Sequence, residues 1–250
     1  MYGVELGHAH TGGSRVGLVR HAAGLRVPRH DHDRACLHVV LRGVYVECSE
    51  DRVVAACAGD LVAKPPGAAH ENRFGTYGAE SLRFELGGDD LRMPAPLDGH
   101  SIDRALARRK ALVHEARVSG EPIVRRPGTQ AGTQAGTPRG TRARVSPQAR
   151  LLVRLRRDFR ERLSLRELAR DLGVHRSHLT RQFTLDFGCS PQTYVLLRRV
   201  AWAAERLPQH TGTLAGLAAD AGFADQSHFT RTFKRVFGST PRHWERDGCR

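Results

Sequence analysis

Short apolar runs separated by Gly, Pro and Asp turns fill the chain up to about residue 90. The runs lie at 16–20, 36–41, 44–48, 60–64 and 81–86. Short strands bounded by turn residues produce this rhythm. The pattern therefore predicts a small antiparallel β domain at the start of the chain.

Apolar residues then recur at helical spacing between Ile102 and Ala116, with arginines between them. This spacing predicts an amphipathic helix, which either covers the β domain or pairs with its copy in a homodimer. The following stretch, 125–145, repeats Gly, Thr and Pro without an apolar face, as flexible linkers do. The sequence thus predicts an N-terminal domain (1–124), this linker, and a C-terminal domain (146–250).

The residues after the linker carry the start and stop signals of a series of helices. Ser164 and Glu167 form a capping box at the start of a short helix. Ser190 and Pro191 are a cap and first-turn pair that begins a longer helix, which we expect to run to Leu207. Because strand signals are missing from this region, we predict an all-α C-terminal domain.

The helical region is internally duplicated. Phe183, Gly188 and Pro191 each have a matching residue 50 positions later, and Ala169 and Gly173 each have one 49 positions later. Each copy reads as a short helix, a glycine-containing turn and a longer helix, which is the layout of a helix-turn-helix. We therefore predict two such units in tandem.

The two longer helices, predicted around 176–187 and 225–237, each have one apolar stripe that packs inward. Their other faces carry side chains that read base edges, because Arg pairs with guanine, Gln with adenine, and Thr with either base. We expect these faces, with their flanking basic residues, to bind DNA. The predicted DNA-binding residues are Arg176, Ser177, Thr180, Arg181, Thr184, Gln226, Ser227, Thr230, Arg231, Lys234 and Arg235.

The distribution of charge indicates the same half of the chain. The formal net charge is +14, with 16 Lys+Arg and 16 Asp+Glu up to residue 124 but 24 and 10 after it. Such an excess points to a polyanionic partner. The sequence shows neither a long apolar run nor a secretory signal, and its five cysteines form no CxxC pair. We therefore expect no membrane partner and a cytoplasmic location.

The C-terminal half resembles the AraC/XylS-type transcription regulators. The resemblance spans roughly 147–246 and rests on the segments GVHRSHLTRQF, FGCSPQTY, LRRVAWAAERL and AADAGFADQSHFTRTFKRVFGSTPRHW. In that family two helix-turn-helix units are joined by a central helix. His175 departs from the pattern, because the family usually has a Ser cap there. The resemblance implies base contacts from Ser177, Thr180, Arg181, Gln226, Ser227 and Arg231.

The N-terminal half resembles the two cupin motifs over roughly 16–86. The first motif is carried by Gly24, His30 and His32, and the second by Gly59, Pro65, Gly67 and His70. The resemblance implies a β-barrel, which AraC-type regulators often use as an effector domain. The fold class we predict is therefore a cupin-like antiparallel β-barrel, a flexible linker and an all-α domain with two helix-turn-helix units.

The cupin resemblance also raises the question of a metal. Cys36 stands where the first motif normally has a Glu ligand. If the barrel closes as in cupins, His30, His32, Cys36 and His70 are candidate ligands for a divalent ion such as zinc, with His38 as a spare. The alternative is a barrel in which these side chains line a pocket for an organic ligand, and there we expect no cofactor.

The leading hypothesis from the sequence is a transcription regulator that binds promoter DNA and responds to a small-molecule effector in its barrel. We expect it not to be an enzyme, since the acidic metal ligand is missing and no general base stands out. A metal-dependent cupin enzyme or metal sensor fused to a DNA-binding module is the alternative. Because the linker is flexible, we expect coupling through dimer geometry or domain docking.

Overall fold

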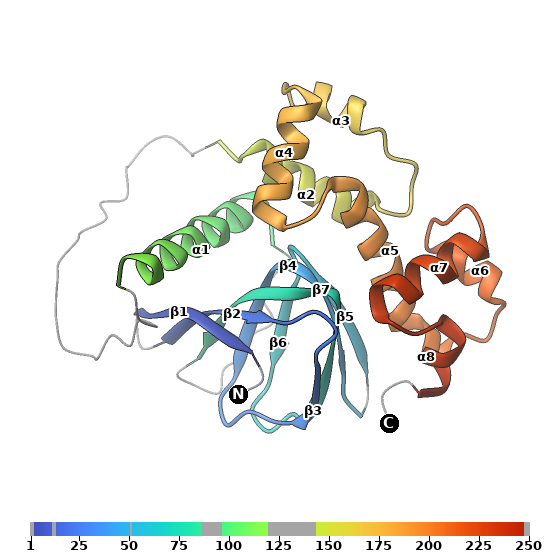
Figure 1. Cartoon of the computed structure of the whole chain (residues 1–250), viewed down its shortest axis with the longest axis horizontal. Coiled ribbons are helices and arrows are strands. Elements are labelled where there is room, and N and C mark those ends of the chain that lie inside the picture. The colour runs from blue at the N-terminus through green and yellow to red at the C-terminus, as the bar shows by residue number, and fades with distance from the viewer. Residues whose placement is uncertain (1–2, 12–13, 51, 87–96, 120–143, 248–250) are drawn as a thin grey trace.

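The computed structural model describes residues 3–11, 14–50, 52–86, 97–119 and 144–247 (Figure 1). An antiparallel sheet comes first along the chain, followed by one long helix and then by a group of helices that contains both repeats. We call residues 3–86 the sheet unit and residues 144–247 the helical unit. The predicted fold class is confirmed. Among the described residues, no helix has the length and apolar character needed to span a membrane.

The sheet unit has seven strands, in which β1-β2-β7-β4-β5 are neighbours, β3 pairs with β7, and β6 pairs with β4. All of these pairs are antiparallel. The two longest strands change partners along their length, so the sheet curls around an interior. The strands are β1 (Val4–Thr11), β2 (Ser14–His21), β3 (Arg26–His30), β4 (Cys36–Cys48), β5 (Val53–Cys57), β6 (Leu61–Lys64) and β7 (His70–Glu85).

Strand β4 corrects one prediction, because the runs expected as two strands at 36–41 and 44–48 are one continuous strand. Its register shifts between Val40 and Arg42 and again between Gly43 and Tyr45. Gly43 has φ +76°, and a Cβ there would lie 2.0 Å from the carbonyl oxygen of Gly78. The glycine therefore lets the strand bend without ending.

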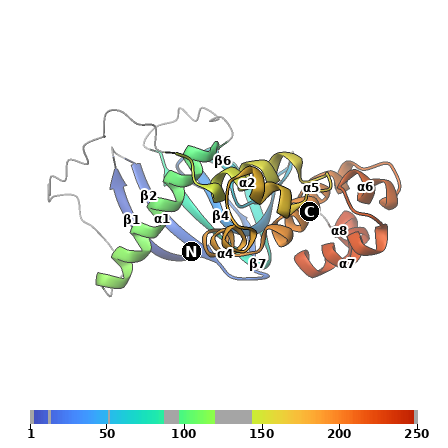
Figure 2. The same ribbon diagram turned by 90° about the horizontal axis from the view of Figure 1, so that it is seen from above.

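Helix α1 (Gly99–Ser119) covers the outer face of the sheet, one of the two roles predicted for it. Leu112 is fully buried in a cluster with Leu18 of β2 and Leu82 of β7. Arg109 forms an ion pair with Glu80 on the same side. In Figure 2, α1 lies over β1 and β2, while α6, α7 and α8 form the opposite end of the molecule.

The helical unit reproduces the predicted duplication. The short helix α3 recurs as α6, and the longer helix α4 recurs as α7 with the same length. Gly188 and Gly238 end the longer helices with the same φ of 77°. The helices are α2 (Pro147–Asp158), α3 (Leu165–Asp171), α4 (Arg176–Phe187), α5 (Pro191–Arg206), the 3-10 turn η1 (Leu207–Gln209), α6 (Leu214–Asp220), α7 (Gln226–Phe237) and α8 (Pro241–Asp247).

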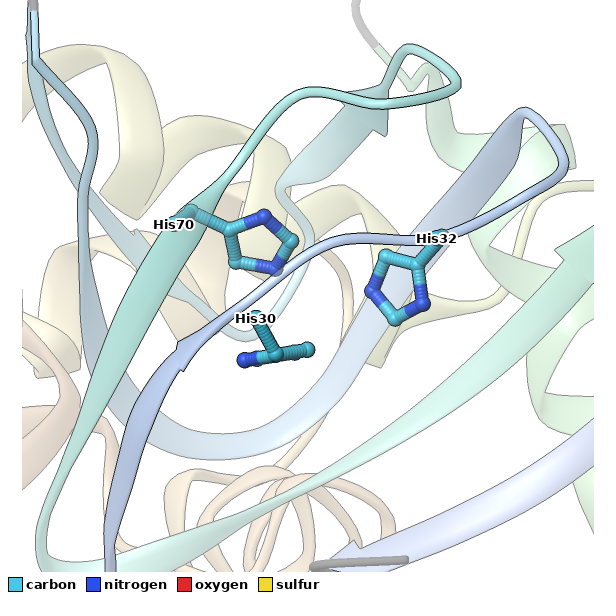
Figure 3. A group of neighbouring side chains, drawn as sticks. All are labelled: His30, His32 and His70. Carbon is cyan, nitrogen blue, oxygen red and sulfur yellow. The ribbon is translucent and has the colours of Figure 1, made fainter.

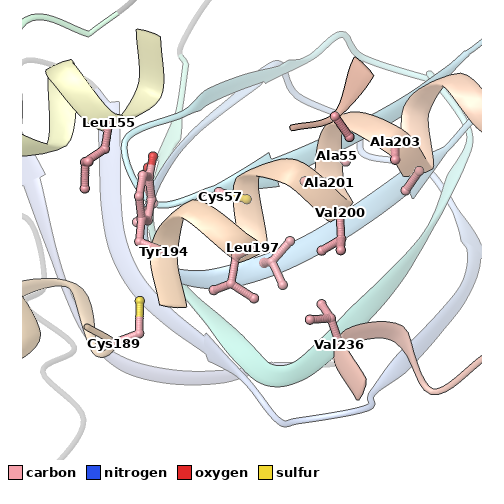
Figure 4. Close-up of a cluster of buried hydrophobic side chains, with 14 of the residues drawn as sticks. Ala55, Cys57, Leu155, Cys189, Tyr194, Leu197, Val200, Ala201, Ala203 and Val236 are labelled. Carbon is pink, nitrogen blue, oxygen red and sulfur yellow. The ribbon is translucent and has the colours of Figure 1, made fainter. Parts of the chain in front are cut away.

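The central helix α5 lies against the edge strand β5, so the two units share one core (Figure 4). Tyr194 donates a hydrogen bond to the carbonyl oxygen of Ala58 at 2.9 Å, and the amide of Ala55 donates to Glu205 at 2.8 Å. Arg198 pairs with Asp60 in the same contact. Most of the linker expected at 125–145 lies outside the described residues, and the predicted domain boundaries stay predictions.

Candidate nucleic-acid interface and sheet cavity

Helix α4 is positioned by its cap and by its apolar stripe. His175 is the N-cap residue, and its Nδ1 accepts from the Ser177 amide at 3.4 Å, which is a long bond. Leu179 and Phe183 are buried against the rest of the helical unit, which turns Arg181 outward. The departure noted at position 175 thus leaves a cap, but one weaker than a Ser, Thr or Asp cap.

Helix α7 repeats this arrangement with a stronger cap. Asp225 accepts a hydrogen bond from the His228 amide at 2.7 Å. Phe229 and Phe233 are completely buried, and Arg231 is exposed on the opposite face. The two helices therefore present equivalent faces, one at each end of α5 (Figure 1).

The structure places all eleven predicted DNA-binding residues at the surface of α4 or α7. Thr180 and Thr230 are half-buried and the other nine are exposed. Within the described part of the chain, none of their basic side chains takes part in an ion pair, so their charge remains available to an external anion. The exposed nine are Arg176, Ser177, Arg181, Thr184, Gln226, Ser227, Arg231, Lys234 and Arg235.

The sheet unit holds both helices near their C-terminal ends. Arg42 of β4 donates to the carbonyl oxygens of Leu185 and Asp186, the latter at 3.1 Å, and so caps the last turn of α4. On α7, Val236 packs against Gly75 of β7, where an added Cβ would lie 3.0 Å from the Val236 carbonyl oxygen. The exposed N-terminal turns of both helices stay accessible.

The interior of the curled sheet is a cavity of about 400 Å³, within the size range of small-molecule sites. Its lining can be derived from the strand register, because directly opposite residues point to the same face. Tyr45 lies opposite Phe74, and His38 lies opposite Arg83. These four residues line the cavity together with Lys64.

Three of the four candidate metal ligands lie together, and two of them, His30 and His32, line this cavity. The ring nitrogens of His30, His32 and His70 lie within 4.8 Å of one another (Figure 3). Cys36 does not join them, because its Sγ donates to the carbonyl oxygen of Arg34 at 3.4 Å. Burial raises the pKa of the Cys36 thiol, which disfavours the thiolate that a metal would need.

The histidine cluster does not fit a metal ion in its present arrangement. The Nδ1 of His70 lies 2.8 Å from the carbonyl oxygen of Ala68, so Nε2 carries the lone pair. That lone pair faces the ammonium of Lys64 at 2.9 Å, and Lys64 is paired with Glu47 at 2.7 Å. An ion bound to Nε2 at about 2.1 Å would occupy the same space as the ammonium.

Three histidines that line the cavity, His21, His32 and His38, stay neutral near pH 7. Desolvation, followed by the positive charge of Lys64, lowers the pKa of His21 and of His32 to about 4. The same two causes lower the pKa of His38 well below its usual value. Each ring therefore offers one N–H donor and one acceptor.

Sequence reasoning missed Lys64, Arg83, Tyr45 and Asn72 as cavity residues. One available signal was composition, since Lys64 is one of only three lysines in a chain with 40 basic residues. A second signal was the position of Lys64 in a run of otherwise apolar residues, because a lysine buried in such a run needs a partner of opposite charge. The partner, Glu47, comes from another strand and could not be found from local pattern.

Comparisons with known proteins identify the helical unit. The family described as "Helix-turn-helix domain" matches residues 168–247. The virulence regulon transcriptional activator VirF of Yersinia enterocolitica is 30% identical over 95 residues, which are 38% of this chain and 35% of that protein. The chain thus spans about a third of the length of the curated relatives it matches.

Two solved structures are similar to parts of the chain. A transcriptional regulator with an AraC-type DNA-binding domain from Chromobacterium violaceum aligns with a TM-score of 0.38 and 27% identity, covering 40% of this chain and 89% of that one. A cupin superfamily protein from Desulfitobacterium hafniense aligns with a TM-score of 0.30 and 18% identity, covering 34% of this chain and 76% of that one.

Proposed function

We propose that the protein is a sequence-specific transcription regulator of the AraC type that binds double-stranded promoter DNA, because residues 168–247 match a helix-turn-helix domain and a relative of this region is a transcriptional activator. In this proposal α4 and α7 read successive segments of the major groove. The observation that carries it is the pair of equivalent exposed faces, whose basic side chains form no ion pairs with other described residues. A helical bundle with a purely structural role does not need such a duplicated face.

The length of the central helix supports this geometry. Helix α5 has 16 residues, which corresponds to about 24 Å of rigid strut. Recognition helices that enter one face of B-DNA in successive turns lie roughly 34 Å apart. A strut of this length, with the turns that flank it, separates α4 and α7 by a distance of that order.

The test is selection of a binding site from random DNA with the full-length chain, followed by competition at physiological salt. A specific regulator should prefer its selected site over random DNA by about a thousandfold or more. Equal affinity for both would contradict the proposal and indicate a nonspecific DNA-binding protein. Genomic footprinting would then locate the natural site and the regulated genes.

We further propose that a small molecule in the sheet cavity controls DNA binding through the contact between the two units. Tyr194, Arg198 and Glu205 of α5 all bond to the sheet unit, so a change in the sheet has a direct route to the helices. Docking of this kind was one of the two coupling modes expected from the sequence. The homodimer and the cytoplasmic location stay predictions.

A metal sensor or metal-dependent enzyme is the alternative expected from the sequence. His30, His32 and His70 do lie together, but the Lys64 ammonium stands where an ion would bind His70. The relative from Yersinia enterocolitica is a transcriptional activator, which supports a regulator rather than an enzyme. Metal analysis of the purified protein separates the two candidates. A zinc, iron, manganese or nickel ion present in stoichiometric amount would favour the metal-dependent alternative.

A further inference from the structure

The cavity is lined by residues with buried polar atoms that have no hydrogen-bond partner among the described residues. These atoms are His32 Nε2, His38 Nε2, Tyr45 Oη, Asn72 Oδ1 and Arg83 Nε. Leaving one such atom unpaired costs about 1–3 kcal/mol, so a fold rarely retains several in one place without a ligand or water for them. Their convergence on one cavity indicates a built binding site.

Lys64 adds an ionised donor to this set. Its side chain is only 4% exposed, and its partner Glu47 is 7% exposed. An ammonium has three donors; His70 Nε2 accepts one, and Glu47 Oε2 lies 2.7 Å from the nitrogen as its ion-pair partner. The remaining N–H is available to a ligand in the cavity.

Arg83 supplies the second ionised donor from the other side of β4. One of its terminal nitrogens pairs with Glu85 at 2.8 Å, while its buried Nε has no hydrogen-bond partner among the described residues. Lys64 lies opposite Cys36 in the pairing of β6 with β4, and Arg83 lies opposite His38 in the pairing of β7 with β4. Two strands that flank the same neighbour are about 10 Å apart. The Lys64 and Arg83 side chains are long and point to the same face of the sheet, so both can reach one small group placed between them. Both charges lower the pKa of His32 and of His38, so their fields overlap inside the cavity.

The rest of the lining is mixed. Glu5, which is paired with Arg15 at 2.6 Å, lies there with Asp31, Asn72 and Ser81, and one part of the wall is apolar and aromatic. His21 stacks on Phe74 with ring centroids 4.2 Å apart, and Tyr45 lies 5.3 Å from the same ring. Val19 and Val27 complete this part of the wall. The cavity therefore suits a compact molecule with an apolar body and one polar end.

We propose that the cavity binds a small organic carboxylate, whose oxygens accept hydrogen bonds from Lys64 and Arg83, and that Lys64 occupies the place beside the three histidines that a metal ion would need. Charge-assisted bonds of this kind are about twice as strong as neutral ones, which favours a carboxylate over an uncharged ligand of the same shape. The inference rests on the proposed function in one respect, since it names the class of the controlling ligand.

The direct test is calorimetric titration of the full-length protein, without DNA, with hexanoate and benzoate and with the corresponding amides. We expect at least one of the carboxylates to bind, and its amide to bind at least tenfold more weakly, because the amide cannot form the charge-assisted bonds. Binding of an amide as tightly as its carboxylate, or no binding of either acid at millimolar concentration, overturns the proposal.

Two variants assign the binding to the named residues. Lys64→Met roughly keeps the length of the side chain and removes the charge, and Arg83→Gln removes the charge on the other strand and leaves a shorter polar side chain. Each should weaken the carboxylate at least tenfold and leave the weak amide binding unchanged. If Lys64→Met does not fold, as judged by circular dichroism, Arg83→Gln still decides. Unchanged carboxylate affinity in the folded variants overturns the proposal.

A metal titration tests the second half of the inference. Cobalt(II) reports its coordination through its visible absorption, so it can be added to the wild-type protein and to Lys64→Met. We expect no stoichiometric binding to the wild type and a gain of binding in the variant, because His70 Nε2 is then free. A cobalt ion bound by the wild type and lost in His70→Ala, or no gain in a folded Lys64→Met, overturns this half.

These outcomes are distinguishable from failure of the proposed function. DNA is absent from all of the titrations, so a protein that lacks sequence preference could still bind the carboxylate. Conversely, a protein that prefers its selected site about a thousandfold but binds no carboxylate would retain the proposed function and lose this inference.

Discussion

Arg181 and Arg231 occupy equivalent exposed positions on α4 and α7, and both are predicted to contact bases. Replacing either one with Ala should cost about 1–3 kcal/mol of binding free energy, because a bidentate Arg–guanine pair is lost. The loss should relax specificity at one base pair and leave the rest of the site unchanged. Measuring affinity for a set of single-base variants of the selected site checks this outcome.

Lys234 and Arg235 provide the matched comparison on the second helix. They lie in its last turn, away from the N-terminal residues expected to reach the bases. Substituting either with Ala should weaken binding to all DNA sequences alike. It should also reduce the slope of log affinity against log salt concentration by about 1, because one phosphate contact is lost. If these variants and the Arg181 and Arg231 variants behaved identically, the division between base-reading and phosphate-contacting residues would be wrong.

Tyr194 is a residue whose role is to join the two units. Its hydroxyl is the donor to the buried carbonyl oxygen of Ala58. Tyr194→Phe should lower the free energy of unfolding by about 1–3 kcal/mol, because the carbonyl loses its partner inside the core. Denaturant titration of the full chain measures the loss. Tyr77→Phe is the control, since Tyr77 is 47% exposed and should change stability little.

At the scale of the helix, the two recognition helices differ in their caps. In α7 the Asp225 carboxylate accepts a hydrogen bond from the His228 amide at 2.7 Å. In α4 the His175 Nδ1 accepts one from the Ser177 amide at 3.4 Å. We expect His175→Ser to stabilise the protein by about 0.5–1 kcal/mol and Asp225→Ala to destabilise it by about 1 kcal/mol. Thermal unfolding without DNA checks both signs. A destabilised His175→Ser would show that the imidazole contributes more than its cap bond.

The elements that the sequence predicted well are those with local signals. The duplicated glycines and caps placed α3, α4, α6 and α7, because a cap bond and a left-handed glycine involve only neighbouring residues. The sequence predicted the strands less well. Strands β1, β3 and β5 were not predicted. VELGHAHT and RVPRH contain too few apolar residues for the alternation to show, whereas VVAAC of β5 is apolar throughout and shows no alternation either.

The two candidate sites also differ in how far the sequence predicted them. The exposed faces of α4 and α7 follow from helical periodicity, so the sequence alone placed all eleven predicted DNA-binding residues at the surface, and their contacts with DNA stay predictions. The cavity depends on strand register across the sheet, and register is decided by tertiary packing. Lys64 and Arg83 are neighbours of β4 only after folding, and Cys36 was separated from the histidines for the same reason.

At the scale of the whole molecule, strands β4 and β7 each have one face in the cavity and the other against the helical unit. Tyr45 lines the cavity, while Val44 and Val46 belong to the shared core. Phe74 lines the cavity, while Gly75 touches Val236 of α7. Because successive residues of a strand point to opposite faces, a ligand that moves Phe74 must also move the contact with α7.

Gly75 is the point at which this coupling can be broken. A Cβ at this position would lie 2.9 Å from Val44 Cγ1 and 3.0 Å from the Val236 carbonyl oxygen, so a larger side chain must separate β7 from α7. We expect Gly75→Val to speed hydrogen exchange in the second half of α7, because that segment loses its support. It should also abolish any effect of a cavity ligand on DNA affinity, while direct DNA binding through α4 and α7 persists.

The control for Gly75→Val is Thr76→Val on the same strand. Thr76 is exposed, and the substitution keeps the branched shape, so exchange in α7 should stay at the wild-type rate. If Gly75→Val left exchange in α7 unchanged, the contact between β7 and α7 would not hold the helix in solution. If exchange rose but the ligand still altered DNA affinity, the signal would pass instead through the contacts of α5 with β5, where Tyr194→Phe tests it.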